Sequence, residues 1–264
     1  MSDAMPPEMQ RKTEDAALKT GNDYSSEQSP ESKVRPVERG LAGRFWNALG
    51  MLLTRTFIRL EGRGIENLPK EAPYILAANH ETYVDGMWIA SFLPKAHWER
   101  FCSLAAADLL THYGPFGRII MKVGRGVPLD RHGSPLHGLQ LAREQLLNKQ
   151  ILLIHPEGTR SRDGRLGKIH DGAAFIARRA NVPIVPVFID GGYEVYSRHH
   201  LLPNPWLKPF RRRRVIIRFG EPIQPQGAAK EISQQLRQWL EDAYAHKEIP
   251  REAVPPRRPK RKKR

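Results

Sequence analysis

The chain has 264 residues and a formal net charge of +15. This length is enough for one domain with a sizeable core, and the charge predicts attraction to phosphate-rich partners: nucleic acid, an anionic membrane surface or phosphorylated small molecules. A single cysteine, Cys102, excludes an intramolecular disulfide framework and a zinc site built from several cysteines.

The two ends of the chain predict tails rather than domains. Residues 1–40 are rich in Ser, Pro, Glu and Lys and poor in apolar residues, so burial cannot offset the entropy lost on ordering, and a disordered polar tail is expected. They contain no apolar run typical of a signal peptide, and no stretch of about 18 apolar residues predicts a transmembrane helix. Residues 248–264 combine prolines with a dense basic run, which predicts a disordered basic tail.

Residues 41–60, LAGRFWNALGMLLTRTFIRL, predict an amphipathic helix. At about 100° per residue, its large apolar side chains fall within an arc of roughly 120°. They are Phe45, Trp46, Leu49, Leu53, Phe57 and Leu60. Arg44, Arg55 and Arg59 lie on the opposite side. Such a helix suits docking to an anionic membrane, and it equally suits packing on the core of its own domain.

From residue 61 to 247 the pattern predicts a single domain in which apolar runs alternate with helices. The predicted strands are 74–78, 118–123, 151–155, 184–189 and 215–219. A helix is predicted over 134–150, where Ser134 can cap and Pro135 suits the first helical position. This alternation predicts an α/β fold with a largely parallel central sheet flanked by helices. Ligands of such sheets bind at the carboxyl ends of the strands.

Two more helices are predicted over 170–181 and 228–246. The second carries apolar side chains at helical spacing, which predicts core packing. They are Ile232, Leu236, Trp239, Leu240, Ala243 and Tyr244.

A histidine follows the predicted strand 74–78 in the segment ILAANHETYVDG. His80 would lie at the carboxyl end of the strand, and Asp85 in the first turn of the next helix. The carboxylate could then accept the Nδ1 proton of the imidazole, which leaves Nε2 free as a general base and stabilises the imidazolium. A surface loop with a capping aspartate would give the same spacing.

Two other segments place polar groups after apolar stretches. GVPLDR ends in Arg131, whose planar guanidinium suits phosphate oxygens. PEGTRS follows the predicted strand 151–155, and its Gly-Thr turn can direct backbone N–H groups at an anion. Glu157 in this segment accepts hydrogen bonds when ionised, so it could hold a substrate hydroxyl or orient an arginine. Each segment alone is equally compatible with an ordinary polar turn.

Taken together, these segments resemble the glycerolipid acyltransferase family, which includes the 1-acylglycerol-3-phosphate acyltransferases. NHETYVDG resembles its first motif, N-H-x4-D, and GVPLDR its second. PEGTRS, at 156–161, resembles the third motif, and VPIVPVFIDG, at 182–191, the fourth. The motifs occur in family order, and the resemblance covers about residues 43–225.

The resemblance implies transfer of a fatty acyl group from an acyl-CoA or acyl-carrier-protein thioester to a glycerolipid hydroxyl, without a metal or bound cofactor. It implies that His80 is the catalytic base, that Asp85 orients it, and that Pro186 shapes the acyl site. The residues implied to bind the glycerophosphate, or to lie beside it, are Arg131, Glu157, Gly158, Thr159 and Arg160.

The sequence therefore predicts an enzyme of phospholipid biosynthesis that is peripheral to the cytoplasmic side of a membrane. The expected acceptor is a lysophospholipid, in the first place 1-acyl-sn-glycerol 3-phosphate. An anionic membrane surface is the expected partner. No specific nucleic acid is expected, because no segment of the sequence predicts base recognition. The alternatives are a noncatalytic lipid-tethering or phosphate- or nucleic-acid-binding protein, and an acyltransferase for a non-glycerophosphate acceptor.

Overall fold

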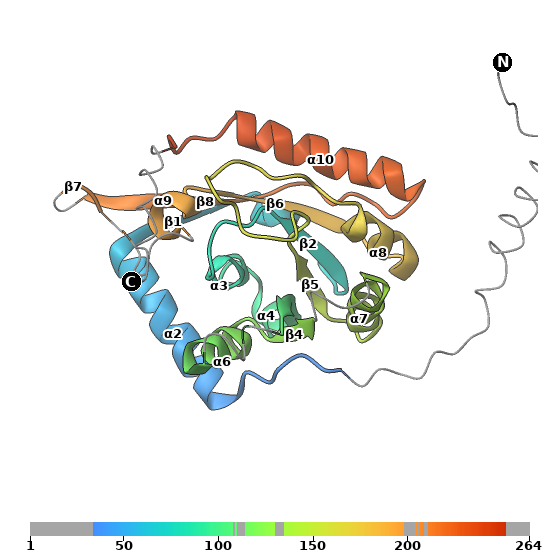
Figure 1. Ribbon diagram of the computed structural model, residues 1–264, viewed down its shortest axis with the longest axis horizontal. Helices are drawn as coiled ribbons and strands as arrows, with labels where there is room; N and C mark the ends of the chain where they lie inside the picture. The colour runs from blue at the N-terminus through green and yellow to red at the C-terminus, as the bar shows by residue number, and fades with distance from the viewer. Residues whose placement is uncertain are drawn as a thin grey trace, which may run out of the picture. The chain divides into compact units, whose positions relative to one another are not determined.

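The computed structural model describes residues 34–107, 109, 114–129, 135–197, 204, 206–208 and 211–251 (Figure 1). Its strands are β1 Ile58–Arg63, β2 Tyr74–Ala78, β3 Phe101–Ala106, β4 Gly126–Leu129, β5 Ile151–Ile154, β6 Ile184–Asp190, β7 Trp206–Lys208 and β8 Arg211–Phe219. Its helices are α2 Gly40–Phe57, the 3-10 helix η1 Ile65–Asn67, α3 Asp85–Ala90, α4 Lys95–Arg100, α6 Gly114–Val123, α7 Pro135–Leu147, α8 Gly172–Ala180, α9 Gly192–Tyr196 and α10 Ala229–Ala245.

The strands form a sheet in the order β1-β8-β6-β2-β5-β3-β4, and β7 pairs with β8 outside this path. Along the path the neighbouring strands are parallel, except that β6 and β8 are antiparallel. The structure thus confirms the predicted α/β fold with a largely parallel central sheet. The carboxyl ends of β2 and β5, which are parallel neighbours, lie at the same edge of this sheet.

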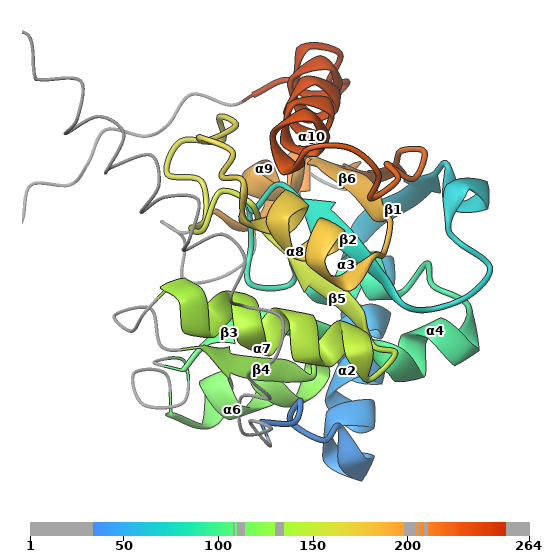
Figure 2. The ribbon, with the colours of Figure 1, turned by 90° about the vertical axis from the view of Figure 1, so that its right-hand side faces the viewer.

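Helices cover both faces of the sheet, and the residues of β2 alternate between two cores. Tyr74, Leu76 and Ala78 join a core with residues of α2 and α3. Ile75 and Ala77 join the core on the other face, which contains residues of α7, α8 and α10 (Figure 2). Because both faces are covered, every residue of β2 is buried and the strand is apolar throughout. The predicted apolar stripe of the last helix lies in the second core.

One predicted strand is wrong, because residues 118–123 belong to helix α6. A short apolar run such as RIIMKV does not distinguish a strand from a buried helical segment. Here Pro115 suits the first turn of a helix, and Gly117 and Met121, four residues apart, are buried on one side of α6.

Strands β1, β3, β4 and β7 are not among the predicted ones. β4 contains Pro128 and is the last strand of the sheet, where a missing N–H is tolerated. The predicted helix 41–60 ends earlier, at Phe57, because Ile58 to Leu60 pair with β8 as part of β1. Pairing across the sheet outweighs the local helical pattern there. Strand β8 begins at Arg211, four residues before the predicted strand 215–219.

The predicted tails are shorter than expected where the structure describes them. Val37 donates its N–H to the Gly126 carbonyl, so residues from 34 onward pack on the domain. At the other end, the N–H groups of Glu248 and Ile249 donate to the buried Asp190 carboxylate, at 2.6 and 3.3 Å. Buried carboxylates require such donors. Residues 1–33 and 252–264, on which the rest of both predictions falls, lie outside the described residues.

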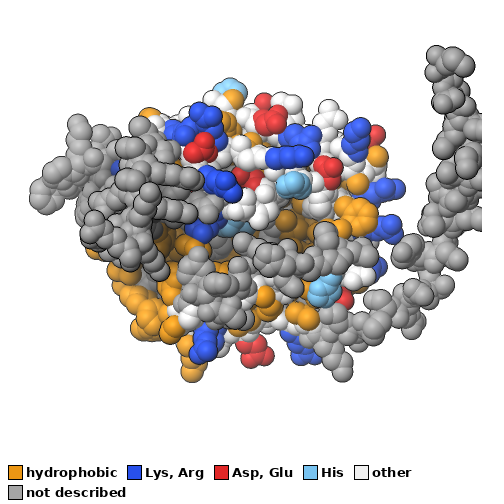
Figure 3. Space-filling model, viewed as in Figure 1, with side chains coloured by type: hydrophobic (Ala, Val, Ile, Leu, Met, Phe, Trp, Pro, Cys, Tyr) orange, Lys and Arg blue, Asp and Glu red, His pale blue; other side chains and the backbone are white. Residues whose placement is uncertain are grey.

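Helix α2 is amphipathic, and its predicted apolar arc is not the side that packs on the domain. Gly43, Met51 and Thr54 are buried. Large apolar side chains that stay exposed on this helix are Leu41, Phe45, Trp46, Leu52, Leu53 and Phe57. Figure 3 shows hydrophobic side chains gathered over the region of α2. Among the described helices, none is long and apolar enough to cross a membrane.

Candidate active site

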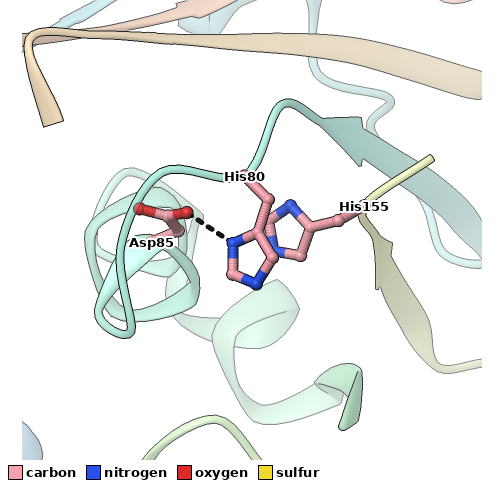
Figure 4. Close-up of side chains that lie close together, drawn as sticks. All are labelled: His80, Asp85 and His155. Carbon is pink, nitrogen blue, oxygen red and sulfur yellow. Dashed lines mark hydrogen bonds and ion pairs between the residues drawn. The ribbon is translucent and has the colours of Figure 1, made fainter. Parts of the chain in front are cut away.

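The predicted pair of His80 and Asp85 meets at the carboxyl end of β2 (Figure 4). His80 follows the strand, and Asp85 is the first residue of α3. The Nδ1 atom of His80 lies 2.8 Å from Oδ2 of Asp85. An ionised carboxylate only accepts hydrogen bonds, so Nδ1 carries a proton, and in the neutral ring the lone pair is then on Nε2. The imidazole is therefore in the tautomer that a general base requires.

Other donors hold the Asp85 carboxylate in place. It accepts the N–H groups of Glu81 at 2.8 Å and Thr82 at 3.0 Å, and the Thr82 hydroxyl at 2.6 Å. Burial alone would raise the pKa of Asp85, but the hydrogen bond and charge of His80, with the Thr82 hydroxyl, hold this pKa below its usual value. Asp85 is thus an anion fixed on the proton of His80.

Residues of the third motif bind both backbone groups of His80, its N–H and its carbonyl. The His80 N–H donates to Oε1 of Glu157 at 2.8 Å, and the Ser161 N–H donates to the His80 carbonyl at 2.8 Å. The second oxygen of Glu157 accepts the Gly167 N–H at 2.8 Å. Burial raises the pKa of Glu157. Through these contacts Glu157 holds the backbone of His80 in place. The predicted contact of Glu157 with the acceptor stays a prediction.

A cavity of about 440 Å³ lies against this pair. His80, Thr159 and Arg160 line it, and helix α2 contributes Trp46, Leu49 and Leu53. Among the described lining residues, Arg160 is the one permanent cation. The cavity therefore brings an apolar wall together with the imidazole of His80 and the guanidinium of Arg160.

Arg160 stands over the ring of Tyr83, with its guanidinium carbon 3.5 Å from the ring centroid. Such cation–π contact fixes the guanidinium plane without consuming its N–H donors. The ring of Tyr83 in turn contacts the edge of Phe116. Tyr83 and Phe116 also line the cavity, so Arg160 is held at the cavity by its aromatic neighbours.

Three predicted site residues remain: Gly158, Pro186 and Arg131. Gly158 occupies a turn with φ of +69°, a conformation that favours glycine, and donates its N–H to the His155 carbonyl at 3.0 Å. Pro186 lies inside β6 beside Ala77 and is not among the described residues that line the cavity. Its predicted effect on the acyl site stays a prediction. Arg131 lies outside the described residues.

His155 is a further residue of the site that the prediction did not include. Its ring stacks on that of His80, with centroids 3.8 Å apart and 9° between the planes. Its Nδ1 lies 3.0 Å from the Ala78 carbonyl and 3.1 Å from that of Asn79. The signal in the sequence was its position directly after the strand 151–154, which pairs with the strand that precedes His80.

The same residues offer a possible metal site, because nitrogens of His80 and His155 and an oxygen of Asp85 lie within 4.8 Å of one another. The geometry does not favour it. The lone pairs of two stacked rings run side by side instead of converging on one point, and Asp85 already accepts the Nδ1 proton of His80. The arrangement suits proton transfer better than metal binding.

The buried carboxyl of Glu81, next to His80, predicts a pH dependence of stability. Burial first, then the nearby Glu194 and Asp85, raise its pKa well above the usual value. The folded state thus keeps this proton while the unfolded state loses it, so stability falls as pH rises above about 4.3, the unfolded value.

Glutamine cannot ionise. We therefore expect the melting temperature of Glu81→Gln, minus that of the wild type, to increase as pH rises from about 5 to 8. Melting temperatures across this range provide the test, with the exposed Glu66→Gln as control. Parallel profiles for wild type and Glu81→Gln would contradict the assignment.

The sequence model of the acyltransferase family matches residues 59–190. The chain is 27% identical over 209 residues to the 1-acyl-sn-glycerol-3-phosphate acyltransferase of Pseudomonas aeruginosa, a match that covers 76% of this chain and 75% of that protein. It is 31% identical over 173 residues to the human 1-acyl-sn-glycerol-3-phosphate acyltransferase beta, a match that covers 64% of this chain and 58% of the human protein.

Among solved structures, the fold is similar to that of the 1-acyl-sn-glycerophosphate (LPA) acyltransferase PlsC from Thermotoga maritima. The TM-score is 0.62 at 23% sequence identity, and the match covers 80% of this chain and 82% of that chain. This likeness supports the fold.

Proposed function

Because the chain belongs to the acyltransferase family, we propose that it transfers a fatty acyl group from an acyl-CoA or acyl-carrier-protein thioester to the hydroxyl of a lysophospholipid. The proposed acceptor is 1-acyl-sn-glycerol 3-phosphate and the product phosphatidate, as the names of the relatives suggest. The observation that carries the proposal is His80, whose Nδ1 is held 2.8 Å from the Asp85 carboxylate, at a largely apolar cavity that contains Arg160.

The proposed reaction is direct transfer between the two substrates, without a metal or bound cofactor. Nε2 of His80 takes the proton of the acceptor hydroxyl while its oxygen bonds to the thioester carbon. The tetrahedral intermediate then collapses, the carbon–sulfur bond breaks, and the imidazolium returns its proton to the thiolate. Asp85 stabilises the imidazolium between these two steps. No serine or cysteine nucleophile is needed, because the acceptor supplies the alcohol.

Arg160 is proposed to bind the phosphate of the acceptor. Its guanidinium is fixed over Tyr83 and lines the cavity near His80. Arg160→Ala should raise the KM for lysophosphatidate about 10- to 100-fold, since hydrogen bonds to charged groups contribute about 1.5–3 kcal/mol. We expect a much smaller change in kcat.

Steady-state kinetics with varied acceptor measure this effect. The matched control is Arg165→Ala, because Arg165 lies in the same segment, is exposed and pairs with Asp163. A loss confined to kcat, or an equal effect of both substitutions, would contradict phosphate binding by Arg160.

Helix α2 is proposed to dock the enzyme on the cytoplasmic side of an anionic membrane. Its exposed apolar side chains would enter the acyl boundary, and the exposed Arg55 of the same helix would face the headgroups. Trp46 and Leu53 are exposed on this helix and also line the cavity. Docking would therefore place the cavity beside the lipid from which a membrane-bound acceptor comes.

Phe45 is 61% exposed, so its replacement tests docking without opening the core. Phe45→Ser should bind anionic vesicles about 10- to 100-fold more weakly, because burying an aromatic side chain contributes about 1.5–3 kcal/mol. Sedimentation with phosphatidylglycerol-containing vesicles gives the measurement. The control Phe175→Ser, which removes an exposed phenylalanine from α8, should bind as the wild type does. Equal binding by Phe45→Ser and wild type would rule out this docking surface.

The acceptor is tested with a panel of lysolipids that differ in headgroup, each presented on vesicles with acyl-CoA and, separately, with acyl-carrier protein. Mass spectrometry of the products identifies which acceptor gains an ester. Phosphatidate as the preferred product would support the proposal. A preference for an acceptor without a glycerophosphate would overturn the substrate, and vesicle binding without any ester product would favour a noncatalytic lipid-tethering protein.

A further inference from the structure

His155 is half-buried beside His80, and its hydrogen bonds define which ring nitrogen carries a proton. Its Nδ1 contacts the carbonyls of Ala78 and Asn79, at 3.0 and 3.1 Å. Carbonyls only accept hydrogen bonds, so Nδ1 carries a proton and donates it to them. Burial first, then the neighbouring His80, lower the pKa of His155 to about 3. The ring is therefore neutral near pH 7.

This protonation state excludes a role of His155 in relaying protons. Its Nδ1–H is committed to two backbone carbonyls that cannot accept a proton themselves. Its Nε2 would have to form a buried cation in order to accept one, which desolvation opposes. What His155 can offer to the reaction is its position.

The hydrogen bond with Asp85 does not by itself fix the ring of His80. With the ring attached at Cβ and held at Nδ1, it can still tilt about the line through these two points. The face of His155 removes this freedom, because its ring lies parallel to that of His80 at 3.8 Å between centroids (Figure 4). The hydrogen bond to Asp85 and the stacking on His155 together define the plane of the His80 ring and thus the direction of Nε2.

The anchor of His155 is the same stretch of backbone that carries His80. Ala78 ends β2, and Asn79 links it to His80. Asn79 is itself bound across the sheet, with its side-chain amide donating to the Ile189 carbonyl at 3.0 Å and accepting the Ile189 N–H at 2.7 Å. His155 and His80 are thus tied to one rigid strand end.

We propose that His155 is a positioning residue for the catalytic base: its neutral ring, anchored on the carbonyls of Ala78 and Asn79, covers one face of His80 and aims Nε2 into the cavity. This inference rests on the proposed acyl transfer by His80. It assigns a role to a residue that contacts the base and does not itself exchange a proton with the substrate.

Three substitutions separate the ring from its anchor. His155→Phe keeps an aromatic face and loses the donor. His155→Asn keeps an amide nitrogen near the place of Nδ1 and loses the ring. His155→Ala loses both. The exposed His170, in the segment that follows the third motif, provides the control His170→Ala.

Steady-state kinetics of acyl transfer and imidazole NMR spectra of the folded proteins are recorded for each variant. We expect His155→Ala and His155→Asn to lower kcat about 10- to 100-fold, the loss typical of a misplacement of about 1 Å. The KM for acceptor and donor should change less than about threefold, because binding groups are untouched. His155→Phe should recover at least half of the lost activity on a logarithmic scale.

The NMR spectra test positioning independently of turnover. The Nδ1–H signal of His80, protected in the wild type and in His170→Ala, should broaden or vanish in His155→Ala as the ring gains motion. An unchanged signal in a folded His155→Ala, or a kcat of this variant within twofold of the wild type, overturns the inference. If turnover still depends on His80, the proposed function stands. Absence of turnover in the wild type overturns the proposed function, and the His80 signal still decides whether His155 positions the ring.

Discussion

Replacing His80 by alanine should lower kcat by about 10²- to 10⁴-fold, the usual contribution of a general base. The acceptor hydroxyl would then have to lose its proton to water, because among the described residues of the cavity no other group is poised to take it. Asp85 is bound by loop donors, and the His155 ring is held neutral by burial. KM values should change little, since the hydroxyl proton contributes little to binding.

The fold should tolerate this substitution. Glu157 and Ser161 bind the backbone of His80, and those contacts remain when the side chain is removed. Thermal unfolding alongside thiol-release assays therefore separates loss of the base from loss of structure, with His170→Ala as the matched histidine control. A folded His80→Ala enzyme that retains more than a tenth of wild-type kcat would exclude His80 as the base.

Asp85→Asn should also lower kcat by about 10²- to 10⁴-fold, because it disturbs the tautomer and orientation of His80. Both carboxylate oxygens accept donors: Oδ2 from His80 and the Glu81 N–H, and Oδ1 from the Thr82 hydroxyl. Whichever way the asparagine amide is turned, its NH₂ group faces another donor. The unfolding free energy should therefore fall by about 1–3 kcal/mol as well.

The pH dependence of this loss follows from the lowered pKa of Asp85. A carboxyl whose pKa is lower when folded stabilises the protein above its unfolded value of about 3.9 and loses this effect as pH falls through the folded value. The stability gap between wild type and Asp85→Asn should thus narrow in acid. The exposed Asp163→Asn serves as control, and a gap that widens in acid would contradict an ionised Asp85.

The sequence predicted the contacts between residues that are close together in the chain. His80 and Asp85 are close in the sequence, so a strand end followed by a helix brings them together. The contacts of Glu157 and His155 with the first motif could not be predicted in this way, because they depend on which strands are neighbours. Only the pairing of β2 with β5 places both segments at one sheet edge.

Packing explains the errors in the predicted elements. The run 118–123 forms a helix because residues spaced four apart meet the core, whereas its composition alone suits a strand equally well. Ile58 leaves the helical pattern because β8 offers it a partner strand. For α2, the sequence defined an apolar arc but not which side of the helix would pack on the domain.

The most direct test of the account is whether thiol release by the purified protein requires a free hydroxyl on the acceptor. Acyl-CoA and acyl-carrier protein would each be supplied with vesicles that contain lysophosphatidate, or phosphatidate, which lacks that hydroxyl. The account predicts thiol release with lysophosphatidate alone, with one new ester formed per thiol, and its loss in His80→Ala. Thiol release that is equal with both lipids, or absent with both donors, would contradict direct transfer to the acceptor hydroxyl.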